Sequence, residues 1–385
     1  MDSSRKIIEI LCVQAGVAID GHRPWDLKVH NQDFYDRVLA DGGLGLGETY
    51  MLGWWDTDDP FTFFKRILPI ARAAGRKNAG WRTALTFIRA HILNLQTRNQ
   101  SRELADVHYN ISNELFERML GPSMAYSCGY WEQANSLDDA QASKYEMICR
   151  KLQLEKGERL LDVGCGWGGF AKYAAETYNV NVVGITVAKE QARHARSHCA
   201  GLPVEIVACD YREFDCFKHG GPFDKVASIG MIEHVGYRNY PTLYAGVHNA
   251  LRDGGLFLLH TIGSNASMET ADAWLTTYIF PGGVIPSVRQ LGEAAEELFV
   301  LHDLQNIGIH YTPTLRAWHD NFDCYWSNKA VKAVRPQVSG SEEVFYRMWR
   351  YYLLSCAADF AVGDSQVWQI VYAKGHLPDG YLRRI

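Results

Sequence analysis

A carboxylate and an imidazole occur at matching places in two neighbouring apolar segments. Glu233 follows the run DKVASIG, and His260 follows the run GGLFLL. Both runs are typical of buried strands, and the carboxyl ends of adjacent parallel strands face one ligand crevice. A lone histidine in an apolar strand is usually a core residue, but burying Glu233 and His260 costs free energy unless they pair or hold a polar ligand. Together they predict a functional site.

A glycine-rich turn lies upstream of this pair. In LDVGCGWGG an apolar run ends at Asp162, and Gly164, Gly166 and Gly168 alternate before a helical pattern. This strand, turn and helix can cradle a phosphate or nucleoside, because glycine lets the backbone approach a ligand. The spacing differs from the dinucleotide fingerprint, and the lysine of a P-loop is missing. The short spacing after Asp162 resembles S-adenosylmethionine methyltransferases; another nucleotide binder and a structural turn remain alternatives.

The next two predicted strands end in residues suited to a nucleoside. One ends at Thr186, where many nucleotide-binding folds place an acid for the ribose hydroxyls. Here Thr186 and Gln191 would supply neutral hydrogen bonds instead. The following strand ends at Asp210 and Tyr211, so that Asp210 would accept from an adenine amino group and Tyr211 would stack on the ring.

Alternating strand and helix patterns must position these residues. Five strands are predicted in RLLDVG, VNVVGIT, PVEIVAC, DKVASIG and GGLFLLHTIG, with helices between them. Such βα units indicate a parallel, doubly wound, Rossmann-like α/β sheet. A late pair of strands, FVLHDLQNIGI and VWQIVYAKG, would close it.

The first 58 residues predict a small mixed α and β region. NQDFYDRVLADGG reads as a helix capped by Asn31 or Asp33 and stopped by Gly42 and Gly43. The following LGLGETYMLGWWD predicts either a packed loop with a tryptophan core or a ligand-facing segment.

Residues 60–102 contain nine lysines and arginines and no acidic residue. Five apolar residues recur within this stretch at helical spacing, with Arg82 and Arg89 off the stripe: Trp81, Leu85, Ile88, Ile92 and Leu95. A basic amphipathic helix suits an anionic membrane surface. The alternative is an interdomain helix whose arginines are simply solvated.

Composition narrows the class of protein. The chain has 385 residues, 47% of them hydrophobic and 22% charged, with a net charge of −5. These values predict a globular protein large enough for two domains and give no reason to expect nucleic acid. Nine cysteines without a C-x-x-C pair favour a reducing cytoplasm over disulfides or a metal site. No apolar run predicts a signal peptide or a spanning helix.

A series of motifs resembles one family over essentially the whole chain. YSCGYW, LDVGCGWGG, VVGITVAKEQ, GMIEHVG, LLHTIG, YIFPGG and PSVRQ occur in the order found in cyclopropane fatty acid synthases and mycolic acid methyltransferases. The resemblance implies a Rossmann-like methyltransferase fold: a mostly parallel seven-stranded sheet with a final antiparallel strand, plus a smaller N-terminal α+β domain. We place the N-terminal domain at 1–102, and the catalytic domain at 103–385 with a helical acyl-chain insert at about 265–300.

The resemblance also implies the ligands of the site. S-adenosylmethionine would bind at Gly164 and Gly166, with further contacts from Tyr126, Ser127, Thr186, Gln191, Asp210 and Tyr211. A bicarbonate ion would be held at Cys128, Glu233, His260, Ile262 and Tyr311. Cys128 and Ile262 would donate backbone N–H groups. Cys356 matches a cysteine once suspected of catalysis in the family, although a thiol in this apolar helical context is more typical of a buried core residue.

The implied reaction transfers a methylene group to the cis double bond of an unsaturated phospholipid acyl chain, with bicarbonate as the base. Aromatic residues of the insert would stabilise the carbocation, with Trp274, Tyr278 and Phe280 as candidates. A methyl-branched product, N-methylation of a small amine and a non-catalytic lipid carrier remain alternatives. The acyl-chain substrate implies a cytoplasmic enzyme that contacts the anionic inner face of the membrane, and analogy with the family implies a homodimer.

Overall fold

The computed structural model describes residues 2–77, 113–267, 272–328 and 341–384. The chain divides into two compact units. The N-terminal unit consists of Met1–Leu93, Thr270–Pro281 and Leu315–Asp364, and the sheet unit consists of Asn94–Glu269, Gly282–Thr314 and Ser365–Ile385. The predicted domain boundary near residue 102 lies outside the described residues, and the division at that point stays a prediction.

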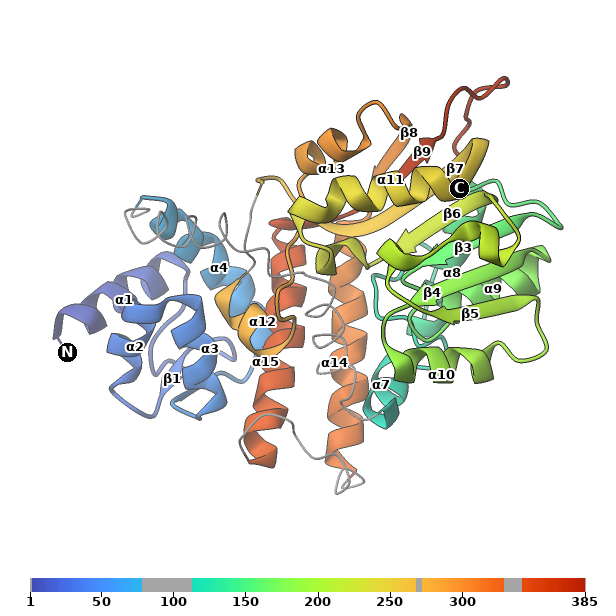
Figure 1. The fold of residues 1–385 in the computed structure, drawn as a ribbon. Helices are drawn as coiled ribbons and strands as arrows, with labels where there is room; N and C mark the ends of the chain where they lie inside the picture. The colour runs from blue at the N-terminus through green and yellow to red at the C-terminus, as the bar shows by residue number, and fades with distance from the viewer. Residues whose placement is uncertain (1, 78–112, 268–271, 329–340, 385) are drawn as a thin grey trace. The chain divides into compact units, whose positions relative to one another are not determined.

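Seven strands form the sheet of the sheet unit, in the order β5-β4-β3-β6-β7-β9-β8 (Figure 1). Strands β3 to β7 are mutually parallel, whereas β9 runs antiparallel to both of its neighbours. The bounds are β3 Arg159–Val163, β4 Asn181–Thr186, β5 Val204–Ala208, β6 Phe223–Ile229, β7 Leu251–Ser264, β8 Val300–Asn306 and β9 Ser365–Ala373. The predicted seven-stranded sheet with a final antiparallel strand is therefore confirmed.

Helices cover both faces of this sheet (Figure 1). Leu160 packs with α8 (Leu137–Lys151) and α9 (Gly169–Tyr178). Its neighbour Leu161 packs with α11 (Tyr240–Ala250) and α13 (Val288–Ala295). Successive residues of β3 thus point to opposite faces, as strand geometry requires, and both faces are apolar because both are covered. Two further helices belong to this unit: α7 Asn113–Leu120 and α10 Lys189–His198.

Short 3₁₀ turns connect several strands to the following elements. They are η1 Tyr211–Glu213, η2 Cys216–His219, η3 Ile232–His234, η4 Tyr237–Asn239 and η5 Gly308–His310. Two of them carry predicted site residues, because η1 begins at Tyr211 and η3 contains Glu233.

The N-terminal unit is mainly helical. Its elements are α1 Asp2–Gln14, β1 Lys28–Val29, α2 Phe34–Asp41, α3 Gly43–Met51, β2 Trp55–Asp56, α4 Pro60–Lys77, α12 Ala273–Tyr278, the part of α14 (Tyr311–Ser327) from Leu315 onward, and α15 Glu342–Ala361. Both α3 and α4 pack on α15. No helix in the described parts of the chain is long and apolar enough to cross a membrane.

The glycine-rich segment after α2 is a helix, so the predicted loop is wrong. Helix α3 begins at Gly43, the second of the two glycines predicted to stop the preceding helix. A Cβ at Gly45 would lie 2.5 Å from the carbonyl oxygen of Arg37, and one at Gly47 would lie 2.3 Å from the Trp274 ring. The glycines therefore serve close packing, which outweighs their poor helix propensity. The predicted tryptophan core is present, since Trp55 is fully buried.

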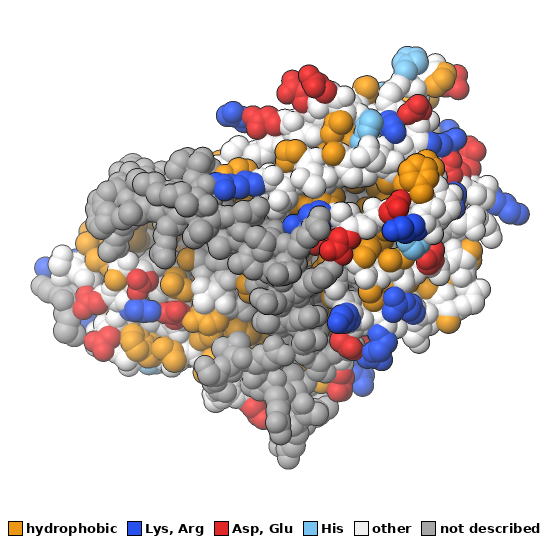
Figure 2. Space-filling model, viewed as in Figure 1, with side chains coloured by type: hydrophobic (Ala, Val, Ile, Leu, Met, Phe, Trp, Pro, Cys, Tyr) orange, Lys and Arg blue, Asp and Glu red, His pale blue; other side chains and the backbone are white. Residues whose placement is uncertain are grey.

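Basic residues of α4 have partners within the N-terminal unit. Arg72 pairs with Asp359 and Asp364, and the Arg66 guanidinium lies 4.6 Å from the ring centroid of Trp25. The stripe from Trp81 to Leu95, with Arg82 and Arg89, lies outside the described residues. On the face shown in Figure 2, basic and acidic side chains are interspersed.

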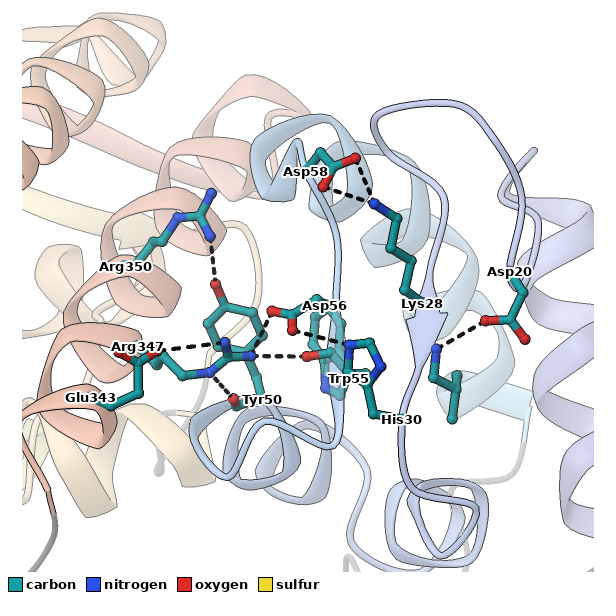
Figure 3. A network of polar contacts seen from close by, with 11 residues as sticks. Asp20, Lys28, His30, Tyr50, Trp55, Asp56, Asp58, Glu343, Arg347 and Arg350 are labelled. Atoms are coloured by element: carbon teal, nitrogen blue, oxygen red, sulfur yellow. Dashed lines mark hydrogen bonds and ion pairs between the residues drawn. The ribbon is translucent and has the colours of Figure 1, made fainter.

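A single arginine of α15 holds the β2 region (Figure 3). Arg347 donates to the carbonyl oxygens of Tyr50 and Trp55 at 2.5 and 2.9 Å, and to Asp56 Oδ1 at 2.7 Å. Its guanidinium also lies 4.2 Å from the Tyr50 ring centroid. Arg347 is 9% exposed, so these donors satisfy backbone carbonyls that have little access to water.

We expect Arg347→Met to destabilise the N-terminal unit by about 3 kcal/mol, because it removes the buried hydrogen bonds to the Tyr50 and Trp55 carbonyls and the cation beside Asp56. Urea unfolding followed by tryptophan fluorescence measures this loss.

Lys28→Met is the matched control, since Lys28 forms an exposed ion pair with Asp58. Its effect should stay within about 1 kcal/mol. Equal effects of the two substitutions would contradict the role given to Arg347.

Candidate active site

The glycine turn after β3 leaves backbone open to a ligand. Gly164 and Gly166 have φ values of +89° and +53°, in the region that favours glycine. A Cβ at Gly164 would lie 2.7 Å from the Met231 side chain, whereas one at Gly166 would meet no atom within 4 Å. Gly164 is therefore required by packing, and Gly166 presents bare backbone. This is a cradle that a nucleoside-containing cofactor fits.

The residues predicted for the ribose and adenine follow β4 and β5. Thr186 Oγ1 donates to Gln191 Oε1 at 3.1 Å, and both residues are buried. The Asp210 carboxylate accepts from the Arg212 side chain at 2.8 and 2.6 Å and from the Arg212 N–H at 2.9 Å. Arg212, which the sequence did not single out, thus fixes the carboxylate beside Tyr211. The contacts of these residues to adenosine stay predictions.

Glu233 and the end of β7 are joined by a hydrogen bond. The Ile262 N–H donates to Glu233 Oε1 at 2.7 Å. Glu233 is 8% exposed, and its Oε2 is buried without a hydrogen-bond partner in the described structure. Burial raises the pKa of Glu233, while the Ile262 N–H favours the charged form and acts in the opposite direction. The N–H predicted to serve an anion is thus bonded to Glu233, and its role toward bicarbonate stays a prediction.

His260 lies within β7 and not at the strand's end as predicted. It pairs in register with Ile229, the last residue of β6, and β7 continues to Ser264. The predicted neighbourhood with Glu233 is nevertheless confirmed: β6 and β7 are adjacent, and Glu233 is bonded two residues beyond His260. The different lengths of the two strands explain why the sequence misplaced the strand end.

Gln369 of β9 orients the imidazole of His260. The two residues are cross-strand partners, and Gln369 Nε2 lies 3.2 Å from His260 Nδ1. An amide nitrogen can only donate, so Nδ1 accepts and the ring carries its proton on Nε2. Burial lowers the pKa of His260 well below its usual value, and the positive charges of Lys144 and Lys151 act in the same direction. His260 is therefore a neutral Nε2–H donor.

The YSCGYW turn packs on the segment that carries Tyr311. Cys128 Sγ lies 3.9 Å from the Ile307 carbonyl oxygen, and the Gly129 N–H donates to Thr314 Oγ1 at 3.0 Å. The Trp131 N–H donates to His310 Nδ1 at 3.1 Å. Tyr311, the first residue of α14, is 7% exposed. Burial raises the pKa of the Cys128 thiol, so Cys128 is a neutral thiol.

The cofactor side of the same turn meets the end of β6. A Cβ at Gly230 would lie 3.7 Å from the Ser127 Cβ, and the Gly230 N–H donates to the His260 carbonyl oxygen at 2.8 Å. The Tyr126 ring packs edge-on against Phe116 with centroids 5.4 Å apart. The structure therefore brings Ser127 and Cys128 to the strand edge that holds Glu233, His260 and Ile262.

Cys356 and the aromatic candidates belong to the N-terminal unit. Burial raises the pKa of the Cys356 thiol, which lies in α15. Trp274 is 1% exposed and its ring centroid lies 4.4 Å from that of Tyr351. Tyr278 donates to Glu48 Oε1 at 3.0 Å, and Phe280 packs edge-on against Tyr352. Among the described residues, no group of His, Cys, Asp or Glu is arranged to hold a metal ion.

The sequence missed three residues that hold predicted site residues: Gln369, Arg212 and Lys144, which donates to Ser127. Gln369 offered a signal, since it is the one polar residue in the run VWQIVYA and such a residue needs a buried partner. Arg212 was marked only by its place in the motif DYR, and Lys144 offered no signal, because lysine is an ordinary surface residue of helices.

Three features define the class of S-adenosylmethionine-dependent methyltransferases. They are the strand order with its antiparallel β9, the glycine turn after β3 and the polar residues that follow the strands. Residues 96–370 match the family model described as mycolic acid cyclopropane synthetase. The chain belongs to this family.

Individual relatives agree with this assignment. The cyclopropane-fatty-acyl-phospholipid synthase of Escherichia coli (strain K12) is 43% identical over 378 residues, covering 97% of this chain and 94% of that protein. Among solved structures, the cyclopropane synthase MmaA2 from Mycobacterium tuberculosis is 30% identical with a TM-score of 0.64, covering 73% of this chain and all of that one. Mycolic acid cyclopropane synthase CmaA1, solved with SAH and CTAB, is 32% identical with a TM-score of 0.62, covering 71% of this chain and 98% of that one.

We expect His260 to keep its proton on Nε2 in the wild-type protein, and Gln369→Leu to yield a mixture of tautomers, because the Nδ1 atom loses its donor. Nitrogen NMR of protein labelled at histidine distinguishes the two forms.

Gln305→Leu serves as the control, since Gln305 of β8 is the other cross-strand neighbour of Gln369. It should leave the His260 signals unchanged. An unchanged His260 spectrum in Gln369→Leu would contradict the orienting role.

Proposed function

We propose that the chain transfers a methylene group from S-adenosylmethionine to the cis double bond of an unsaturated acyl chain in membrane phospholipid. The product is a cyclopropane ring, and bound bicarbonate is the general base. The family, the E. coli relative and the CmaA1 structure support a lipid substrate for S-adenosylmethionine-dependent cyclopropanation. The phospholipid acceptor goes beyond that support and is proposed by analogy with the named E. coli relative, whereas the base rests on the site.

The donor and acceptor set beside the point where β6 ends against β7 is the observation that carries the proposal. Glu233 Oε2 is a buried acceptor without a partner among the described residues, and His260 Nε2 is a donor held in place by Gln369. Bicarbonate has an O–H group that can donate and charged oxygens that can accept, so these two groups fit it. Tyr311 and the backbone of Cys128 complete the proposed ligand set, together with the Ile262 N–H, which the ion would share with Glu233 Oε1.

Each of these residues has a role that follows from its protonation state. His260 is neutral and donates without the cost of burying a second cation beside the sulfonium. Glu233 Oε1 is occupied by Ile262, which turns Oε2 toward any ligand that donates. A charged Glu233 and a charged bicarbonate would repel each other at hydrogen-bonding distance. Glu233 therefore holds the ion by accepting a hydrogen bond from its O–H group.

When bound, S-adenosylmethionine supplies the electrophilic methyl carbon, and bicarbonate supplies a base that removes a proton from the transferred methyl. Gly164 and Gly166 would present backbone to the cofactor, with Tyr126, Ser127, Thr186, Gln191, Asp210 and Tyr211 around it. Cys356 has no proposed catalytic role, because its thiol is neutral. Aromatic residues of the 265–300 segment would stabilise the cation.

A phospholipid substrate requires contact with the bilayer. We therefore propose that the acid-free stretch 60–102 binds the anionic inner face of the membrane from the cytoplasm. Arg66 and Arg72 of α4 already have partners within the protein. We therefore propose that the basic residues after α4 in the sequence make the membrane contact. A homodimer is also proposed, by analogy with the family.

Glu233→Gln should lower ring formation by about 10²-fold or more, because the amide replaces the free acceptor Oε2 with a donor. Mass spectrometry of acyl chains measures this after vesicles of cis-unsaturated phosphatidylglycerol are incubated with enzyme and S-adenosylmethionine. The dissociation constant for S-adenosylmethionine should not change.

Glu205→Gln is the control for this assay, since Glu205 lies on β5 and pairs with His219 at the surface. The wild-type enzyme should also lose activity in buffer depleted of carbon dioxide and regain it with added bicarbonate. If the activity of Glu233→Gln stays within twofold of wild type, the proposed bicarbonate base is contradicted.

The double substitution Arg82→Glu and Arg89→Glu should weaken binding to anionic vesicles by more than tenfold, because each charge near the surface contributes about 1 kcal/mol. Vesicle co-sedimentation at physiological salt measures the affinity, and zwitterionic vesicles measure the uncharged background. Arg193→Glu, on the exposed face of α10, is the matched charge reversal. Unchanged binding by the Arg82 and Arg89 variant would contradict the membrane role and indicate that these arginines are simply solvated.

A further inference from the structure

Two residues of α8 hold the backbone and side chain of Ser127. Lys144 Nζ donates to Ser127 Oγ at 2.8 Å and to Gln141 Oε1 at 2.6 Å. Gln141 Nε2 donates to the Ser127 carbonyl oxygen at 3.0 Å. Lys144 and Gln141 are three residues apart and so share one face of the helix. Both are completely buried.

Burying this lysine is costly, and within the described part of the chain its Nζ forms no ion pair with a carboxylate. The polar atoms bonded to Lys144 Nζ are the neutral oxygens of Ser127 and Gln141. Burial lowers its pKa to about 7, while the charge of Asp162 at the glycine turn acts in the opposite direction. A fully buried amine without an ion-pair partner is expected where the charge or the donor is needed.

Lys151 shows the structural alternative on the same helix. It is equally buried, seven residues further along α8, and its Nζ lies 3.6 Å from Asp303 Oδ2. Arg383 also donates to Asp303, so this cluster fastens the C-terminal residues. Lys151 contacts no predicted cofactor residue, which separates it from Lys144.

We propose that Lys144 is a positioning residue for the cofactor: it occupies a lone pair of Ser127 Oγ, so that the Ser127 hydroxyl proton is donated to the carboxylate of S-adenosylmethionine. This rests on the proposed assignment of Ser127 to the cofactor. In its ammonium form, which prevails below the pKa of about 7, Lys144 has donors only, so Ser127 Oγ accepts in this bond and its own proton points elsewhere. A donor chain that ends on an anion is strengthened at each link.

A double-mutant cycle tests the proposal by calorimetric titration with S-adenosylmethionine, without lipid. Lys144→Met and Ser127→Ala should each raise the dissociation constant about tenfold. The double variant should bind within about threefold of Ser127→Ala, because Lys144 acts through the hydroxyl that is already gone.

Lys151→Met is the matched control, and it should lower the melting temperature without changing the dissociation constant. Lys144→Gln covers the case in which Lys144→Met does not fold, because the amide keeps a donor for Ser127; its affinity should lie between those of wild type and Ser127→Ala. Effects of Lys144→Met and Ser127→Ala that multiply, or wild-type affinity in either single variant, would overturn the proposal.

This outcome is independent of the product. Failure to form a cyclopropane ring in the vesicle assay would overturn the proposed reaction. The coupling between Lys144 and Ser127 could still be measured from the affinity for S-adenosylmethionine. A purely additive cycle would overturn the role of Lys144 while leaving the reaction intact.

Discussion

The hydrogen bond between the Ile262 N–H and Glu233 Oε1, at 2.7 Å, is the contact on which the site depends. Strand β7 continues past the end of β6, whose last residue pairs with His260. Beyond that point β7 still pairs with β9, but a backbone donor on the side facing β6 has no strand to bond, and a buried donor without a partner is costly. The Glu233 side chain takes the place of the missing strand. The same bond fixes one carboxylate oxygen and leaves the other available to a ligand.

Other predicted site residues are held in a similar way by polar partners distant from them in sequence. Gln369 fixes the tautomer of His260, and Lys144 occupies an acceptor site of Ser127. Each contact satisfies a buried polar group and at the same time limits what the residue can offer a ligand. Packing and preorganisation of the site therefore come from the same few hydrogen bonds.

The sequence predicted the sheet and the neighbourhood of Glu233 and His260 because apolar periodicity and strand ends are local signals. It misplaced His260 relative to its strand's end because strand length depends on the neighbouring strand. It also gave a packed loop as one of two alternatives for α3, since the close contacts of Gly45 and Gly47 are made with segments elsewhere in the chain. The partners Gln369 and Lys144 could not be assigned, because register across the sheet and the face of α8 are set by packing. Among the cofactor residues, Tyr126 and Ser127 were reached through resemblance to the family, whereas the others were predicted from the glycine turn and the strand ends.

Removal of a proton from the transferred methyl is the central claim, and isotope labelling tests it directly. Vesicles of cis-unsaturated phospholipid would be incubated with the enzyme and S-adenosylmethionine that carries three deuterium atoms on its methyl group. Mass spectrometry of the acyl chains should then show a ring carbon that retains two deuterium atoms. An acyl chain that retains all three as a methyl branch would contradict ring closure and the need for a base at Glu233 and His260.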